Sequence, residues 1–110
     1  MDTVTVQEVA DYLQAPTDLV QLVDVREPQE LAIAQVAGFL NLPLSEYEQW
    51  SGKIQSILDP DREIWVMCHH GVRSGQMCHW LETQGYSKIK NITGGIHAYS
   101  VEVDRSIPLY

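Results

Sequence analysis

The chain has 110 residues and a mass of 12.5 kDa, so we expect residues 1–110 to form one domain. Apolar residues make up 45% and charged residues 20%, which is typical of a globular protein and excludes a disordered one. Seven Lys and Arg against fifteen Asp and Glu give a net charge of −8, which argues against a protein that binds nucleic acid or an anionic membrane.

The first residues, Met1-Asp2-Thr3, lack the basic start and the long apolar run of an export signal. The longest apolar run, Ile64 to Cys68, is too short to cross a bilayer. We therefore expect a cytoplasmic protein without a membrane partner, in a compartment where thiols stay reduced.

Strands and helices are predicted to alternate along the chain. The first helix begins at a capping box of Thr5 and Glu8 and carries Val6, Val9 and Leu13 on one face. The later predicted elements are a buried strand over 19–25, a short helix over 28–34, an extended piece over 38–43, a helix over 46–58 opened by a capping box of Ser45 and Glu48, a strand over 63–68, a helix over 74–84 stopped by Gly85, a strand over 88–92 and a helix over 96–103. Gly52 is placed to break the helix over 46–58.

This alternation predicts an α/β fold with a parallel sheet covered by helices on both faces. Ligands of such sheets bind beyond the carboxyl ends of the strands. Asp24, Val25 and Arg26 follow one predicted strand there, and Cys68 ends another.

Cys68 and Cys78 are the two cysteines of the chain. Cys78 shares an apolar helix face with Leu81, which predicts core packing. A zinc site would have to recruit Cys68, His69, His70, Cys78 and His79, whose spacing does not match that of structural zinc sites, so we expect no metal and no other cofactor.

The segment after Cys68 predicts a reactive thiolate. His69-His70-Gly71-Val72-Arg73 joins a strand end to a helix start, where backbone N–H groups and the helix dipole favour an anion. Helix starts and nearby cations such as Arg73 also stabilise a cysteine thiolate. The loop therefore predicts a nucleophilic Cys68, with residues 69–73 binding an anionic group beside its sulfur.

At this point the chain resembles the rhodanese family of sulfurtransferases. The segments that carry the resemblance are Val23-Asp24-Val25-Arg26-Glu27-Pro28-Gln29-Glu30, Ala37-Gly38-Phe39-Leu40-Asn41-Leu42-Pro43, Val66-Met67-Cys68-His69-His70-Gly71-Val72-Arg73-Ser74, Gly85-Tyr86 and Asn91-Ile92-Thr93-Gly94-Gly95-Ile96. The resemblance implies a three-layer α/β/α sandwich with a five-stranded parallel sheet, in one copy.

The resemblance also implies an activity. Cys68 would take a sulfane sulfur from a small anionic donor such as thiosulfate, form a persulfide, and pass the sulfur to cyanide, a thiol or a protein. The backbone N–H groups of His69, His70, Gly71 and Val72 would cradle the persulfide, and Arg73 would hold either the loop or the donor. A module that only relays sulfur between proteins, or binds a partner without catalysis, is the alternative. The chain departs from the family at Ala34-Gln35-Val36, where a His is frequent, and at Tyr99, where a Trp is frequent, and both departures concern packing more than chemistry.

Phosphatases and arsenate reductases of related fold provide a competing interpretation. They have five residues between the cysteine and the arginine, whereas this chain has four, which favours sulfur over the larger phosphate. The side chains of His69 and His70 act either as a general base or only as solvent-facing neighbours of the cradle. Arg26 either attracts an anionic donor or pairs with Glu27, Glu30 or Asp24 and holds the loop. The acidic chain would suit a basic protein partner, and transfer to such a partner would weaken with salt.

Overall fold

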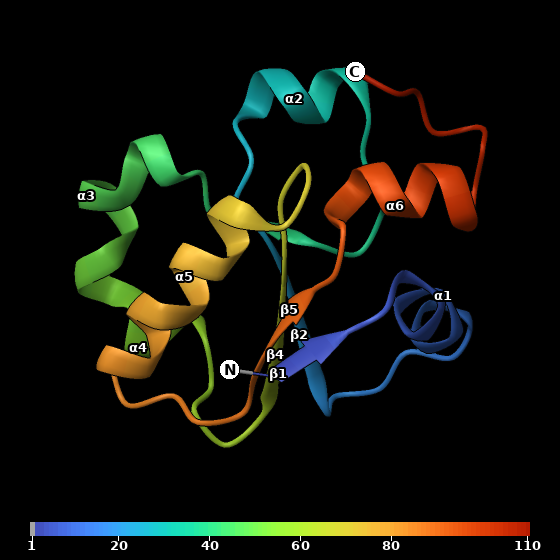
Figure 1. Ribbon diagram of the computed structural model, residues 1–110. Helices are drawn as coiled ribbons and strands as arrows, with labels where there is room; N and C mark the ends of the chain where they lie inside the picture. The colour runs from blue at the N-terminus through green and yellow to red at the C-terminus, as the bar shows by residue number, and fades with distance from the viewer. Residues whose placement is uncertain (1) are drawn as a thin grey trace.

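The computed structural model describes residues 2–110 and contains one sheet of five parallel strands in the order β1-β5-β4-β2-β3 (Figure 1). The strands are β1 (Asp2–Val4), β2 (Val20–Asp24), β3 (Leu40–Asn41), β4 (Glu63–Met67) and β5 (Ile89–Ile92). The helices are α1 (Val6–Gln14), α2 (Pro28–Ile33), α3 (Tyr47–Trp50), α4 (Ile54–Ile57), α5 (Val72–Thr83) and α6 (Gly95–Glu102), with 3-10 turns η1 (Leu44–Glu46) and η2 (Ser51–Lys53).

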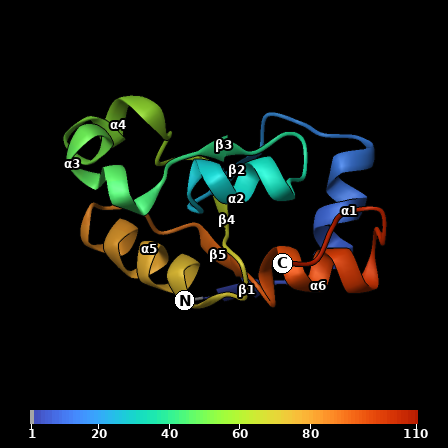
Figure 2. The ribbon, with the colours of Figure 1, turned by 90° about the horizontal axis from the view of Figure 1, so that it is seen from above.

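Helices cover both faces of this sheet, as Figure 2 shows from above: α3, α4 and α5 lie on one side, and α1 and α6 on the other. An apolar core lies on each face. The two faces of β4 explain why its sequence is apolar from Ile64 to Met67. Ile64 and Val66 face the first core, and Trp65 and Met67 face the second. The predicted three-layer α/β/α sandwich is therefore confirmed.

Local sequence accounts for the helix boundaries. The capping box of α1 forms as predicted, because Glu8 N–H donates to Thr5 Oγ1 at 3.1 Å and Thr5 N–H donates to Glu8 Oε1 at 3.2 Å. Pro28 starts α2, where its fixed φ is favourable and no N–H is needed. Gly85 follows the end of α5 with φ +96°, as its predicted stopping role requires.

The segment over 46–58 differs in part from its prediction. It consists of four short pieces, η1, α3, η2 and α4, and the predicted break at Gly52 is confirmed, since Gly52 lies in the 3-10 turn that separates the two α-helical pieces. The capping box of Ser45 and Glu48 does not form, since Ser45 lies inside η1 and its hydroxyl donates to Glu27.

The sheet positions the functional candidates at one edge. The pairing of Asp24 with Met67 sets the carboxyl ends of β2 and β4 side by side, so the loops that follow them are neighbours. The end of the chain lies beside α2 at this edge (Figure 1), where the Tyr110 hydroxyl donates to Glu30 Oε2 at 2.6 Å. Within residues 2–110, no helix has the length and the apolar character that a membrane crossing requires.

Candidate functional site

Cys68 directly follows β4, and its sulfur lies inside the loop that leads to α5. The Gly71 N–H donates to Cys68 Sγ at 3.0 Å. The loop can turn back on the sulfur because Gly71, which caps α5, has φ +117°, a conformation that side chains disfavour. Cys68 is only 1% exposed, so the loop and its neighbours cover almost all of its surface.

Ser74 and Asn91 complete the surroundings of the sulfur. The Ser74 hydroxyl lies within hydrogen-bond distance of two acceptors, Cys68 Sγ at 3.2 Å and Asn91 Oδ1 at 2.5 Å. Asn91, on β5, also donates from Nδ2 to the carbonyl of Gly71 at 2.9 Å. A hydroxyl carries one proton, so Ser74 can turn it toward the sulfur when negative charge develops there.

The start of α6 fixes the backbone of the loop from the other side. The Ile96 N–H donates to the carbonyl of Cys68 at 2.9 Å, and the His97 N–H donates to the carbonyl of His69 at 3.1 Å. In a planar trans peptide the carbonyl and the following N–H point in opposite directions, so the amides of the loop are turned away from α6. The close approach requires Gly95, because a Cβ there would lie 2.3 Å from the Cys68 carbonyl oxygen.

Arg73 anchors the loop to α2. Its guanidinium forms a bidentate ion pair with Glu30, with N–O distances of 2.6 and 2.8 Å. The hydrogen bonds from Arg73 lower the pKa of Glu30 to about 2, against the opposing effect of burial. Of the two roles considered for Arg73, the geometry favours holding the loop over holding the donor.

Asp24 and Arg26 form a buried ion pair behind the loop. Arg26 donates to both carboxylate oxygens of Asp24 at 2.8–3.1 Å, and from NH1 to the Ala34 carbonyl at 2.9 Å and the Tyr110 hydroxyl at 3.0 Å. The side chain of Arg26 is 0% exposed and that of Asp24 is 2% exposed. A buried guanidinium cannot attract a donor from solution, so the geometry favours the structural alternative for this pair.

The two loop histidines differ in exposure: His69 is half-buried, whereas His70 is exposed, which agrees with the solvent-facing alternative for His70. The His69 ring stacks on that of Tyr110 with centroids 3.9 Å apart, and its centroid lies 4.0 Å from that of His70 with the two rings tilted by 30°. Burial and, next, the neighbouring His70 lower the pKa of His69, which favours its neutral form. The side chain of Val72, by contrast, is 73% exposed, so this residue contributes to the loop by its backbone, as the first residue of α5.

The second cysteine lies outside the site. Cys78 is 0% exposed in the core beside Leu81, as predicted, and burial raises the pKa of its thiol to about 12. His79 is exposed on α5, where its Nδ1 lies 3.8 Å from a Glu82 oxygen. The zinc ligand set considered for Cys68, His69, His70, Cys78 and His79 is therefore not assembled, and the structure instead brings His97 to His69 and His70.

Sequence reasoning missed several residues of the site: the side chains of Ser74 and Asn91, and the contributions of His97 and Tyr110. Asn91 gave a weak signal, as an uncharged polar residue next to the end of a strand whose Ile89 and Ile92 are apolar. Glu30 was considered only as one of three candidate partners of Arg26, and the structure pairs it with Arg73 instead. Its pairing with Arg73 spans 43 residues and depends on the tertiary fold.

Comparison with known proteins agrees with this geometry. A family model described as the rhodanese-like domain matches residues 5–102. The chain is 45% identical over 109 residues to the Rhodanese-like/PpiC domain-containing protein 12, chloroplastic, of Arabidopsis thaliana. This match includes 97% of the present chain but only 36% of that relative. It is 36% identical over 86 residues to a protein named sulfurtransferase from Allochromatium vinosum, with 78% of this chain and 77% of the other covered.

A solved structure supports the same assignment. The rhodanese-related protein of Thermoplasma volcanium matches with a TM-score of 0.76 and 27% identity over 94% of each chain. The sequence matches extend across the cysteine loop and the strands that hold it, so the chain belongs to the rhodanese-like sulfurtransferase family.

Proposed function

We propose that this domain transfers a sulfane sulfur from a donor such as thiosulfate to a thiophilic acceptor through a persulfide on Cys68. The observation that carries the proposal is the position of the Cys68 sulfur, which follows a buried strand and accepts the Gly71 N–H at 3.0 Å. A sulfur held by an amide donor at a helix start is suited to bear negative charge.

The first half-reaction loads the enzyme. The Cys68 thiolate attacks the outer sulfur of thiosulfate, a new S–S bond forms, and the original S–S bond breaks with its electron pair leaving on sulfite. The Gly71 N–H and the Ser74 hydroxyl are positioned to stabilise the negative charge of the persulfide. The contact with Asn91 Oδ1 keeps the Ser74 hydroxyl next to the sulfur, and its single proton turns from Asn91 to the sulfur when the charge forms; Asn91 Nδ2 also donates to the Gly71 carbonyl.

The second half-reaction unloads it. Cyanide or a thiolate attacks the terminal sulfur of the persulfide, and the electron pair of the S–S bond returns to Cys68 as a thiolate. With cyanide the product is thiocyanate, and no net oxidation occurs over the cycle. The ion pair of Arg73 and Glu30 keeps the loop in place through both steps.

The short loop argues against phosphate chemistry. Only four residues separate Cys68 from Arg73, and the Gly71 amide already contacts the sulfur itself. A phosphate above the sulfur would need those donors farther out. Arg73 would also have to leave Glu30 to reach a phosphate.

The test is thiocyanate formation from thiosulfate and cyanide by two matched variants. Cys68→Ser should abolish the activity while the far-ultraviolet circular dichroism spectrum stays unchanged, because a hydroxyl cannot form a persulfide. Cys78→Ser should retain the activity, since Cys78 is sealed in the core. Activity that survives in Cys68→Ser would refute the proposal.

Charge bears on the natural partner. At a net charge of −8 the chain repels dianionic thiosulfate at long range and attracts a basic surface. We therefore expect a protein donor or acceptor with a basic docking face. Transfer to such a partner should fall steeply as salt rises from low ionic strength, and transfer that is indifferent to salt would contradict this expectation.

A further inference from the structure

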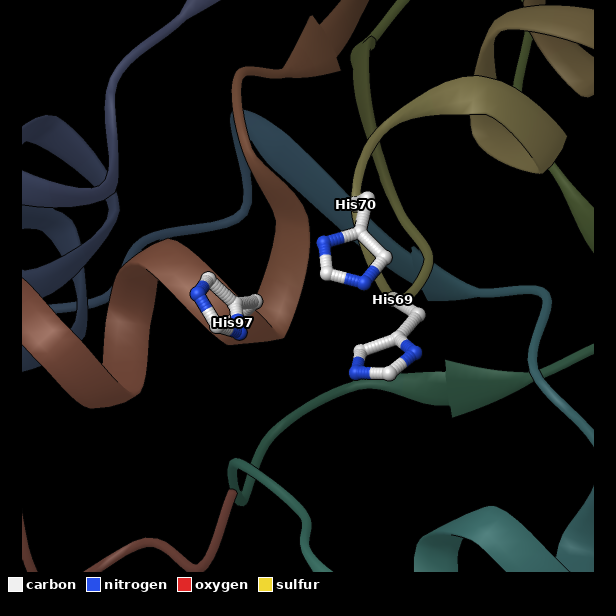
Figure 3. Close-up of side chains that lie close together, drawn as sticks. All are labelled: His69, His70 and His97. Atoms are coloured by element: carbon white, nitrogen blue, oxygen red, sulfur yellow. The ribbon is translucent and has the colours of Figure 1, made fainter. Parts of the chain in front are cut away.

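Three histidines from two separate segments meet beside the cysteine loop. His69 and His70 precede α5, and His97 lies in the first turn of α6 (Figure 3). One ring nitrogen from each can be chosen so that all three lie within 4.8 Å of one another. The rings of His70 and His97 have centroids 4.9 Å apart, and those of His69 and His97 are 6.3 Å apart.

The backbone makes this meeting a fixed feature of the fold. The His97 N–H donates to the carbonyl of His69 at 3.1 Å, so the two segments cannot separate without breaking the contact that shapes the loop. Gly95 permits the close approach. On its outer side the His69 ring is stacked on Tyr110, with an interplanar angle of 4°. Two of the three rings are half-buried, and His70 is exposed.

We propose that His69, His70 and His97 bind one divalent transition-metal ion, with Zn²⁺ as the probe. Imidazole nitrogen is a preferred ligand of zinc, copper and nickel. Zinc–nitrogen bonds of about 2.0–2.1 Å place the nitrogens of a tetrahedral site roughly 3.4 Å apart. Metal binding would bring the ring nitrogens from their present separations of up to 4.8 Å to that value by side-chain rotation, chiefly of His70, which is exposed.

The charges around the cluster tolerate a cation. Arg73 is the nearby permanent positive charge, and its bidentate pair with Glu30 neutralises it. The chain as a whole carries a net charge of −8. Three protein ligands leave a fourth position open for water or an anion, which is the arrangement of accessible zinc sites rather than closed structural ones.

The site is independent of the sulfur chemistry. Its ligands are imidazoles, whereas the Cys68 sulfur is 1% exposed and turned toward Gly71 and Ser74. A bound ion would join the loop that follows Cys68 to α6 through side chains as well as through the backbone.

The experiment is a zinc titration against a chromophoric chelator. It uses the Cys68→Ser protein as the parent, so that no thiolate at position 68 competes for the metal. The parent should bind one Zn²⁺ per chain. His97→Ala should weaken the affinity by at least about 100-fold, because loss of a neighbour that only orients a ligand already costs 10–100-fold.

The control is His79→Ala, which removes an exposed histidine outside the cluster and should leave zinc affinity unchanged. His70→Ala is the second cluster variant; it should also weaken zinc binding, and because His70 is exposed its removal should leave the fold intact. The proposal is overturned if the parent binds no zinc, if both cluster variants bind as tightly as the parent, or if His79→Ala causes the loss instead.

Discussion

The ion pair between Arg73 and Glu30 can be removed with little change of shape by Glu30→Gln. The amide keeps the size of the carboxylate but loses its charge, so Arg73 loses the bidentate partner that ties the cysteine loop to α2. The hydrogen bond that the Tyr110 hydroxyl donates to the same carboxylate at 2.6 Å is weakened as well.

The magnitude follows from the pKa of Glu30, which the fold lowers from 4.5 to about 2. At about 1.4 kcal/mol for each pH unit of displacement, this sets a ceiling of about 3 kcal/mol on the free energy of unfolding. The side chain of Arg73 is 33% exposed and that of Glu30 18%, so solvent screening reduces the expected loss to about 1–2 kcal/mol.

The loss depends on pH in a defined direction. A carboxyl whose pKa is lowered by folding stabilises the fold fully above its unfolded pKa of 4.5, and this contribution disappears as pH falls toward about 2. The difference in unfolding free energy between wild type and Glu30→Gln should therefore be constant near neutral pH and shrink through that window.

Urea denaturation followed by tryptophan fluorescence at several pH values measures this difference. Glu48→Gln makes the same chemical change at an exposed position of α3 and should cost little at any pH. If Glu30→Gln matches the wild type at neutral pH, or if the difference persists undiminished below pH 3, the reasoning about this ion pair is refuted.

Three further predictions concern the support of the loop and the core. Gly95→Ala should cost about 2–5 kcal/mol and reduce sulfur transfer, since its Cβ would clash with a carbonyl oxygen at 2.3 Å; Gly52→Ala, with open space around it, is the control, and equal urea midpoints would contradict the clash. Asp24→Asn leaves Arg26 buried beside a neutral partner and should lower the unfolding free energy by about 3–5 kcal/mol, a loss that thermal denaturation would show and that an unchanged midpoint would disprove. Cys78, whose pKa is raised to about 12, should resist iodoacetamide at mildly alkaline pH in the folded protein and react in urea; mass spectrometry of the native protein showing alkylation at this residue would count against its burial.

Local sequence patterns predicted the elements whose buried residues form a continuous apolar run or recur at regular spacing. The strand Glu63–Met67 and the helix Val72–Thr83 are of this kind. The strand Asp2–Val4 was not placed, because two of its three residues are exposed and only Val4 is buried. Its existence depends on pairing with Ile89–Ile92, which is distant in sequence.

The broken helix after Pro43 has a local signal and tertiary anchors. Gly52 is expected to interrupt the helix, and it lies in the 3-10 turn Ser51–Lys53 between α3 and α4. Trp50, Ile54 and Leu58 recur every four residues and lie in the same core. The Trp50 indole N–H donates to the Pro43 carbonyl at 2.9 Å, a contact that the local pattern does not predict.

The candidate site divides in the same way. The loop from Cys68 to Arg73 is contiguous, so residue types and spacing were enough to identify it as the candidate site. Glu30 and His97 are distant from the loop in sequence and reach it only because of the strand order in the sheet. Residue spacing therefore could not predict that they contact the loop. Position in the fold therefore decided the role of Arg73 and created the histidine cluster.

The most direct test of the sulfur-transfer proposal is the intact mass of the protein after thiosulfate and then after cyanide. We predict a gain of one sulfur atom, located by peptide mapping at Cys68, and its complete removal by cyanide. Cys78→Ser should behave in the same way and Cys68→Ser should gain nothing. A reduced protein that gains no mass from thiosulfate, or gains it at Cys78, would contradict the proposal.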